Sequence, residues 1–190
     1  MITPFHKRSD FPEVLTLDIK IQIFYERVTG WQLDIADMVI NGVKVNNGTI
    51  IISPIVGSGY ATLDIIMSYF EMIAKYRDGY CTIGEPKKYF AEGLKMVFPE
   101  LCKKHPWIPE KMYYNVRCGL YHHGLTEGDI MLLGEGFPPI TPTKEGERLI
   151  VNPHTLVLEL KKHFEAYKNQ LKDDKDLRSN FEKRFDYDST

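Results

Sequence analysis

Apolar residues recur at intervals of three and four between positions 58 and 77, and this spacing constrains the fold more than any other feature of the sequence. An α-helix has 3.6 residues per turn, so residues at these intervals lie on one face. The segment is therefore predicted to be one long amphipathic helix. The residues of that face are Ala61, Ile65, Ile66, Tyr69, Phe70, Ile73 and Tyr76.

Other segments also show helical patterns. Between residues 11 and 33 the spacing fits both strand and helix, and the length favours a helix. Segments 86–98 and 109–123 each open with a proline in the first turn, where its missing N–H is harmless. Asn152 before Pro153 is typical of an N-cap and first helical residue, and it predicts a helix over 153–171. A short last helix is expected to hold Leu177, Phe181 and Phe185.

Strand signals are local. A hairpin is predicted over residues 43–52, because Asn46-Asn47-Gly48 supplies the positive φ values of a tight turn. Residues 130–133 and 148–151 form a second candidate pair, separated by the Gly- and Pro-rich stretch 134–146. Both pairs are expected to be small β insertions on a helical body.

Length and composition limit the class of protein. The 190 residues are 43% apolar and 26% charged. This excludes disordered, collagen-like and low-complexity chains and fits one domain. The fold class expected is therefore mainly α: an antiparallel bundle of four or five helices with one or two small β hairpins, in a single domain over residues 1–190.

Charge and cysteine content limit partners and location. The formal net charge of −2 gives no global attraction to phosphate backbones or anionic membranes, so any contact with nucleic acid must be local. The first residues lack the apolar stretch of a signal peptide, and no apolar run approaches the length of a membrane span, which predicts a cytoplasmic protein without membrane contact. Cys81, Cys102 and Cys118 are odd in number and lack CxxC spacing, which argues against a disulfide framework and a cysteine zinc site.

Candidate chemistry concentrates in residues 113–124, on the predicted helix 109–123. This string holds one arginine, two histidines, one asparagine and three tyrosines. At 100° per residue, Asn115 and His122 share a face, whereas Arg117 and His122 are about 140° apart. The long Arg117 side chain could still flank one groove together with His122.

The sequence NVRCGLYHHG within this string resembles the active helix of the HEPN superfamily, helical domains named for nucleotide binding in higher eukaryotes and prokaryotes. Ribonucleases of that superfamily carry Arg, then four to six residues, then His. Arg117 is followed by His122 after four residues and by His123 after five. Cys118 stands where many members have a polar residue directly after the arginine. The specific resemblance covers about twelve residues.

The resemblance implies a metal-independent endoribonuclease. Such cleavage needs proton carriers and a positive charge on the phosphorane, and the 2′-hydroxyl of RNA is the nucleophile. Histidine titrates near neutrality, and arginine offers a planar set of donors to phosphate oxygens. We therefore expect RNA as the partner, Arg117 as the stabilising cation, His122 or His123 as acid and base, and Asn115 to orient the His122 ring. His122 has the commoner family spacing. No cofactor or metal is expected.

Two other interpretations stay open. His122 and His123 followed by Gly124 can simply be a helix C-terminus, where imidazolium complements free carbonyls and glycine adopts positive φ. The three tyrosines are expected to be core and rim aromatics. The protein could then be a catalytically silent helical module that binds a nucleotide, an RNA end or a protein, or it could be purely structural.

Other constellations are weaker. Cys102 and His105 could be metal ligands, but Pro106 beside them suggests a packed loop. Asp64 and Glu71 could share a face of the long helix, where a solvated role is expected. The sequence Gly57-Ser58-Gly59 could hold an anion at a helix N-terminus, although Ser58 as an N-cap explains it.

One helix offers one cation and one well-aimed imidazole, whereas the chemistry needs two proton carriers. HEPN nucleases assemble composite sites from two chains, and the resemblance extends this arrangement to the present chain. We therefore expect a homodimer with the 109–123 helix at the interface, with apolar contacts from Met112, Val116 and Leu120. No motif identifies a neutralising protein partner.

Overall fold

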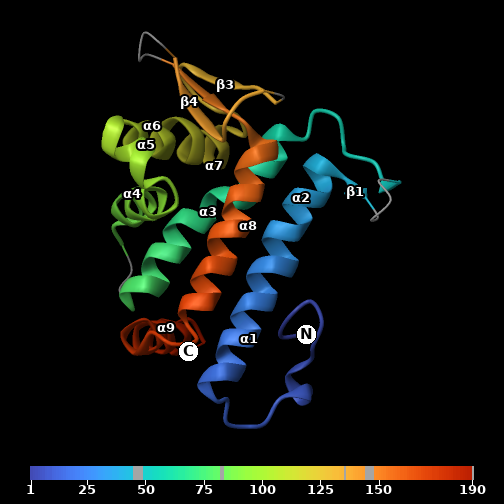
Figure 1. Ribbon diagram of the computed structural model, residues 1–190, viewed down its shortest axis with the longest axis vertical. Coiled ribbons are helices and arrows are strands. Elements are labelled where there is room, and N and C mark those ends of the chain that lie inside the picture. The colour runs from blue at the N-terminus through green and yellow to red at the C-terminus, as the bar shows by residue number, and fades with distance from the viewer. Residues whose placement is uncertain (45–48, 82–83, 135, 144–147, 190) are drawn as a thin grey trace.

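A computed structural model describes residues 1–44, 49–81, 84–134, 136–143 and 148–189. Helices make up 64% of it, which confirms a mainly α fold. The long helices run side by side along the molecule, α9 crosses one end, and the small sheets lie toward the other end (Figure 1). No helix in the described ranges combines the length and apolarity needed to cross a membrane.

The first helical segment is shifted relative to the predicted range 11–33. Helix α1 (Leu17–Val28) continues through a π-helical segment, η2 (Thr29–Leu33), into α2 (Asp34–Asn41). It starts at Leu17 because Thr16 is its N-cap, with the Thr16 hydroxyl accepting from the Ile19 N–H. In the preceding loop, the Arg8 guanidinium donates to the carbonyl oxygens of Pro12 and Glu13 at 2.8 and 2.7 Å. The helical segment ends late because Gly42, at φ 70°, is the first residue to leave the helix.

Helix α3 (Gly59–Asp78) confirms the long amphipathic helix and lies at the centre of the fold. It packs against α2, α4, α8 and α9. Helix α4 (Pro86–Val97) approaches so closely that a Cβ at Gly93 would lie 1.8 Å from the Phe70 carbonyl oxygen, which only glycine avoids. Next to α3, the Phe24 ring of α1 stacks on Tyr76 at 4.0 Å and meets Phe164 and Phe181 edge-on.

The remaining predicted helices are confirmed within a few residues. The structure differs from the prediction in one helix type and in one extra helix. Residues 108–123 are helical throughout, but their middle is π-helical. A short helix at residues 99–104 was not expected from the sequence. The elements are α5 (Pro99–Lys104), α6 (Ile108–Lys111), the π-helical η3 (Met112–Cys118), α7 (Gly119–His123), α8 (Pro153–Gln170) and α9 (Lys175–Asp188).

Asn152 joins α8 to the small sheet. Its side-chain oxygen accepts from the backbone N–H of His154 at 3.1 Å, as the predicted N-cap requires. Its amide nitrogen donates to the carbonyl oxygens of Gly134 and Phe137 at 2.8 and 2.7 Å. The side chain is buried, and these bonds satisfy its oxygen and both N–H groups.

The first predicted hairpin is confirmed. Strands β1 (Val43–Lys44) and β2 (Ile50–Ile52) pair antiparallel, with an irregular register at β1. The predicted turn at Asn46-Asn47-Gly48 lies outside the described residues.

The second predicted pair is not a hairpin. Strands β3 (Ile130–Leu132) and β5 (Leu149–Val151) run parallel, and β4 (Ile140–Pro142) pairs antiparallel with β5. The stretch between β3 and β5 is long enough for the crossover that a parallel pair needs. It contributes a strand of its own where the sequence suggested only a Gly- and Pro-rich connection.

A histidine is held without its charge between α3 and α8. The His163 Nδ1 atom lies 2.8 Å from the Tyr69 hydroxyl oxygen, and the ring is partly buried. Burial, with a smaller contribution from the Arg77 charge, lowers the pKa of His163 from 6.5 to about 4.

This shift predicts a pH-dependent stability. Between pH 6.5 and 4 the unfolded chain binds a proton that the folded chain excludes, so the free energy of unfolding falls as the pH falls. Allowing for the partial exposure of the ring, we expect a loss on the order of 2 kcal/mol at pH 4.5. Urea unfolding at pH 7 and 4.5 checks it. Between these two pH values, the free energy of unfolding of His163→Gln should fall by less than that of the wild type. Identical falls in the two proteins would refute the prediction.

Candidate functional site

The predicted site helix is a continuous helical segment whose middle, η3, is π-helical. One side of it is buried: Met112 and Val116 are 0% exposed and Leu120 is 5% exposed. The prediction that these three residues form apolar contacts between two copies is therefore wrong, because they pack in the core of their own chain. An apolar stripe on a helix can face the core of its own chain or a second chain. Here it faces the core, because α3 and α4 contact η3, and α3 contacts α7.

Arg117 is held by two tyrosines and a carboxylate. Its guanidinium carbon lies 4.5 Å from the ring centre of Tyr121 and 5.7 Å from that of Tyr113, within the range of cation–π attraction. One of its nitrogens lies 3.8 Å from Glu71 Oε2 on α3. Glu71 also pairs with Lys75 at 2.5 Å. No hydrogen bond from Arg117 occurs within the described residues, so its donors are available.

The π-helical geometry changes the predicted angles. A π turn closes over five residues, so it rotates less per residue than the 100° assumed for an α-helix. Burial raises the pKa of the Tyr113 hydroxyl, and interactions with the Cys118 thiol add to the rise. The path from Asn115 to His122 crosses the π segment, so the common face predicted for these two residues does not follow, whereas Arg117 to His122 runs mainly through α7 and the predicted separation of about 140° changes little. The π segment contains Arg117 and ends one residue after it.

The two histidines differ in their surroundings. Both are exposed at the end of α7. His123 Nε2 lies 2.9 Å from Glu127 Oε1, whereas His122 makes no ion pair or hydrogen bond through its ring within the described ranges. Their ring centres are 6.3 Å apart. Gly124 ends the helix at φ 71°, as the helix-stop interpretation expects.

Asn115 anchors the loop that follows α7. Its amide nitrogen donates to the Glu127 carbonyl oxygen at 3.1 Å, and its own carbonyl oxygen accepts from the Glu127 N–H at 2.7 Å. Gly119 allows this loop to pack closely, because a Cβ there would lie 2.7 Å from the Leu125 carbonyl oxygen. The amide group of Asn115 thus holds Glu127 and makes no hydrogen bond to His122 in the described structure.

We expect Asn115→Ala to lower the free energy of unfolding by about 1 kcal/mol, because it removes the side-chain hydrogen bond to Glu127. Thermal or urea unfolding measures the change. Asn169→Ala is a matched control on the exposed surface of α8, where the amide makes no hydrogen bond within the described residues. Equal effects of the two substitutions would contradict the anchoring role.

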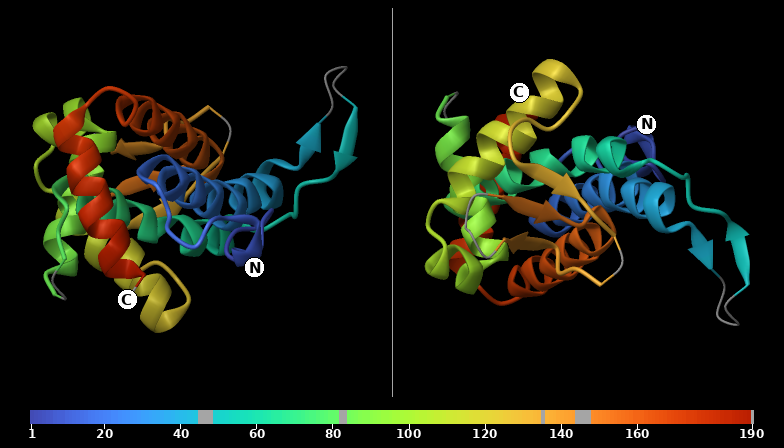
Figure 2. Two further views of the ribbon diagram at one scale, coloured as in Figure 1. Left: turned by 90° about the horizontal axis from the view of Figure 1, so that it is seen from below. Right: turned by 90° about the horizontal axis from the view of Figure 1, so that it is seen from above.

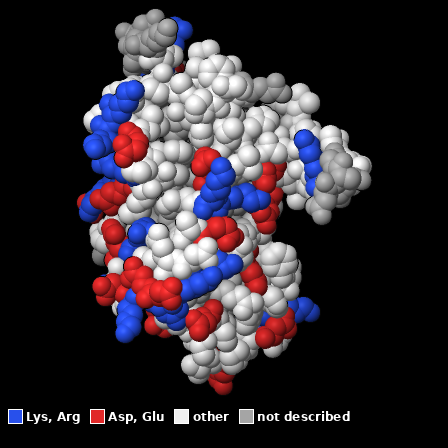
Figure 3. All heavy atoms as spheres, viewed as in Figure 1, with Lys and Arg blue, Asp and Glu red and all other residues white. Residues whose placement is uncertain are grey.

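The surroundings of the string include exposed rings and lysines. Tyr113 is 8% exposed and belongs to the core, whereas Tyr114 and Tyr121 are 48% and 52% exposed. Lys103 and Lys104 of the preceding α5 are exposed. Over α5 and α6, Lys and Arg side chains gather at the upper left of the face shown in Figure 3, with acidic groups among them. Exposed aromatic rings beside lysines are residue types that surfaces binding single-stranded nucleic acids use.

The alternative metal ligands do not assemble into a cluster. The Cys102 thiol is buried against the Leu94 carbonyl oxygen, and burial raises its pKa to about 11. The His105 ring packs edge-on against Trp107. Within the described residues, no group of three or more His, Cys, Asp or Glu side chains is placed to hold a metal ion. Asp64 is exposed, and Glu71 pairs with cations.

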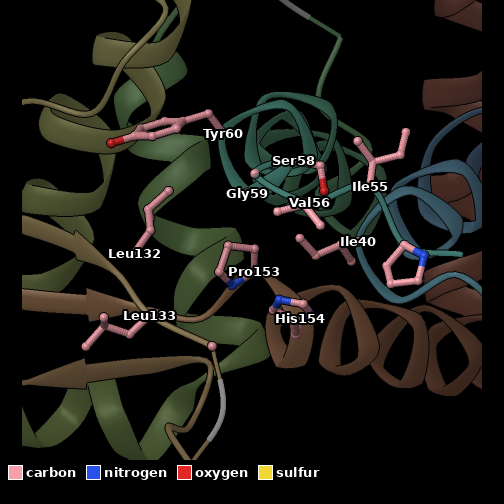
Figure 4. Close-up of a pocket in the computed structure, with 13 residues that line it drawn as sticks. Ile40, Ile55, Val56, Ser58, Gly59, Tyr60, Leu132, Leu133, Pro153 and His154 are labelled. Atoms are coloured by element: carbon pink, nitrogen blue, oxygen red, sulfur yellow. The ribbon is translucent and has the colours of Figure 1, made fainter.

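The glycine-flanked Ser58 precedes α3, but its side chain does not cap it. The hydroxyl donates to the Val39 carbonyl oxygen at 3.3 Å instead. Ser58 and Gly59 line an apolar pocket of about 440 Å³, together with Ile55, Val56 and His154 (Figure 4).

Comparison with protein-family models, with curated proteins and with solved structures finds no significant match to this chain.

Proposed function

We propose that the chain is an endoribonuclease of HEPN type that cleaves RNA without a metal ion. One observation carries the proposal: a single helix presents a guanidinium with available donors and, five residues later, an exposed imidazole without a polar partner among the described residues. These are the cation and one of the two proton carriers that the cleavage chemistry requires. The resemblance of the 113–124 string to HEPN ribonucleases supports the same function.

In the proposed reaction, Arg117 binds the phosphate that becomes the phosphorane. Tyr113 and Tyr121 restrict its side chain, so that less conformational freedom is lost on binding. The 2′-oxygen attacks phosphorus and its proton passes to an imidazole. The bond to the 5′-oxygen breaks, and that oxygen receives a proton from a second acid. The products are a 2′,3′-cyclic phosphate and a 5′-hydroxyl.

His122 is the proposed proton carrier. His123 is paired with Glu127, which restricts its ring, whereas His122 makes no such pair with any residue that the structure describes. The second proton carrier would come from a second copy of the chain, as the resemblance implies. Because Met112, Val116 and Leu120 are buried, this pairing would have to use the exposed side of the helix, where Tyr114 and Tyr121 lie.

The proposal predicts the effect of single substitutions on cleavage of a single-stranded RNA in EDTA. We expect Arg117→Ala and His122→Ala each to slow cleavage by at least about 100-fold, the range for losing one catalytic proton donor or charge. Glu71 keeps Lys75 as a partner in Arg117→Ala, so this variant should stay folded. His123→Ala is the matched control, with a loss below about 10-fold.

Two outcomes would contradict this mechanism. The first is loss of cleavage on chelation that added zinc or manganese restores. The second is RNA binding without cleavage by the wild-type chain, which would favour the silent binding module.

Glu71 gives a second prediction, because its carboxylate would compete with a bound phosphate for the Arg117 guanidinium. Glu71→Gln removes the competing charge, so we expect RNA to bind about 3- to 10-fold more tightly in a fluorescence anisotropy titration at low salt. The gain should shrink as salt is added. Asp64→Asn makes the same charge change at an exposed position of the same helix and serves as control. Equal gains in both variants would show that Glu71 does not act on Arg117.

A further inference from the structure

The β1–β2 hairpin, which connects α2 to α3 along the chain, projects from the helical body as an arm (Figures 1 and 2). Val43 pairs with Ile52 and Lys44 with Ile50, and the hairpin is separate from the sheet of β3, β4 and β5. A two-stranded hairpin alone is marginally stable in water. Something beyond its own two strands is therefore expected to support it.

Strand β2 is apolar on both of its faces. Ile50, Ile51 and Ile52 are 52%, 59% and 45% exposed, and successive residues of a strand point to opposite faces. Ile55 and Val56, just beyond the strand, are 61% and 99% exposed. Residues 49–56 contain no charged side chain. The outer edge of β2 thus lacks the charges that usually prevent exposed strands from pairing with other chains.

We propose that β2 pairs with β2 of a second copy of this chain, so that the hairpin is a dimerisation arm. The pattern of the strand is complementary to itself. In an antiparallel pair centred on a two-fold axis at Ile51, this residue faces the partner's Ile51 and Ile50 faces the partner's Ile52. Only isoleucines meet, so the pairing brings no like charges together.

The resulting assembly closes on itself. Two hairpins form a four-stranded sheet in which both β2 strands are central and both β1 strands are at the edges. Lys44 then lies on each outer edge, where a lysine discourages further pairing. A two-fold contact of this kind uses the same surface of both chains, so this interface alone joins two copies, and it is separate from the pairing proposed for the 109–123 helix. A dimer of this kind accounts for the difference between the two strands of the arm: β1, at the outer edge, carries Lys44, and β2, in the centre, carries no charge.

Pairing at the strand edge leaves both faces of the four-stranded sheet in solvent, so the exposed isoleucines are only partly covered. We therefore expect a weak dimer, below the size class of stable interfaces. The apolar surface continues past the arm, since Ile55 and Val56 also border the pocket that Tyr60 lines in Figure 4. The proposal does not depend on nuclease activity or on the 109–123 helix.

The test is the mass of the full chain in solution. We expect sedimentation equilibrium between about 1 and 100 μM to show a monomer–dimer equilibrium for the wild type. Ile51→Lys places two like charges on the two-fold axis and should raise the dissociation constant by at least about 10-fold. Val14→Lys makes a similar change at an apolar side chain that is 80% exposed outside the arm, and it should leave the dimer intact. Circular dichroism of both variants verifies that the helical body is folded.

A cross-link tests the register. Residues directly opposite in an antiparallel pair are 4.5 to 5.5 Å apart at Cα, a span that a disulfide bridges. Ile51→Cys should therefore give a disulfide-linked dimer under mild oxidation, while the wild type, with its three native cysteines, controls for other links. A wild-type monomer at 100 μM, a dimer that survives Ile51→Lys, or no cross-link through Cys at position 51 would each overturn the proposal. Cleavage assays of the same variants report on the proposed nuclease separately.

Discussion

The burial of α3 is the constraint on which the rest of the structure depends. Its buried residues cover about half of its circumference, which is too wide a face for one neighbouring helix, and α2, α4, α8 and α9 all pack against it. Burying a large side chain contributes about 1.5 to 3 kcal/mol, and several of these are aromatic. The close approach at Gly93 and the rings around Phe24 show how α4 and the terminal helices meet it. The bundle is organised around one helix.

The same helix supports the candidate site. Glu71 is on a part of α3 that is not fully buried, and from there it reaches both Lys75 and Arg117. At 3.8 Å the contact with Arg117 is a loose ion pair between partly exposed groups, which contributes little stability. Its greater consequence is to limit where the guanidinium can go. A carboxylate that orients an arginine also competes with phosphate for it, so in the proposed function Glu71 both positions Arg117 and weakens its binding of phosphate.

Apolar spacing and capping residues predicted the helices well because both are local. The period of residues 61–76 and the pair Asn152-Pro153 each act within one element. The π-helical η3 was not predictable in this way, since apolar residues four apart fit an α-helix as well. The parallel pairing of β3 with β5 depends on a strand in the connection, which the sequence did not reveal. Met112, Val116 and Leu120 were assigned to the wrong partner for a related reason: a stripe on a helix does not say what covers it.

Arg117 and His122 belong to one helix but are positioned by different parts of the molecule. Arg117 lies against α3 and between two tyrosine rings, so its place depends on the core. The end of α7 depends on the loop that Asn115 anchors and that packs against Gly119. The proposed reaction needs both groups fixed to within a fraction of an ångström. Asn115, proposed from the sequence to orient an imidazole directly, instead holds the loop against the helix that carries both groups. A residue can thus be required at a site for its effect on the backbone, and such a role is visible only once the loop and the helix are seen together.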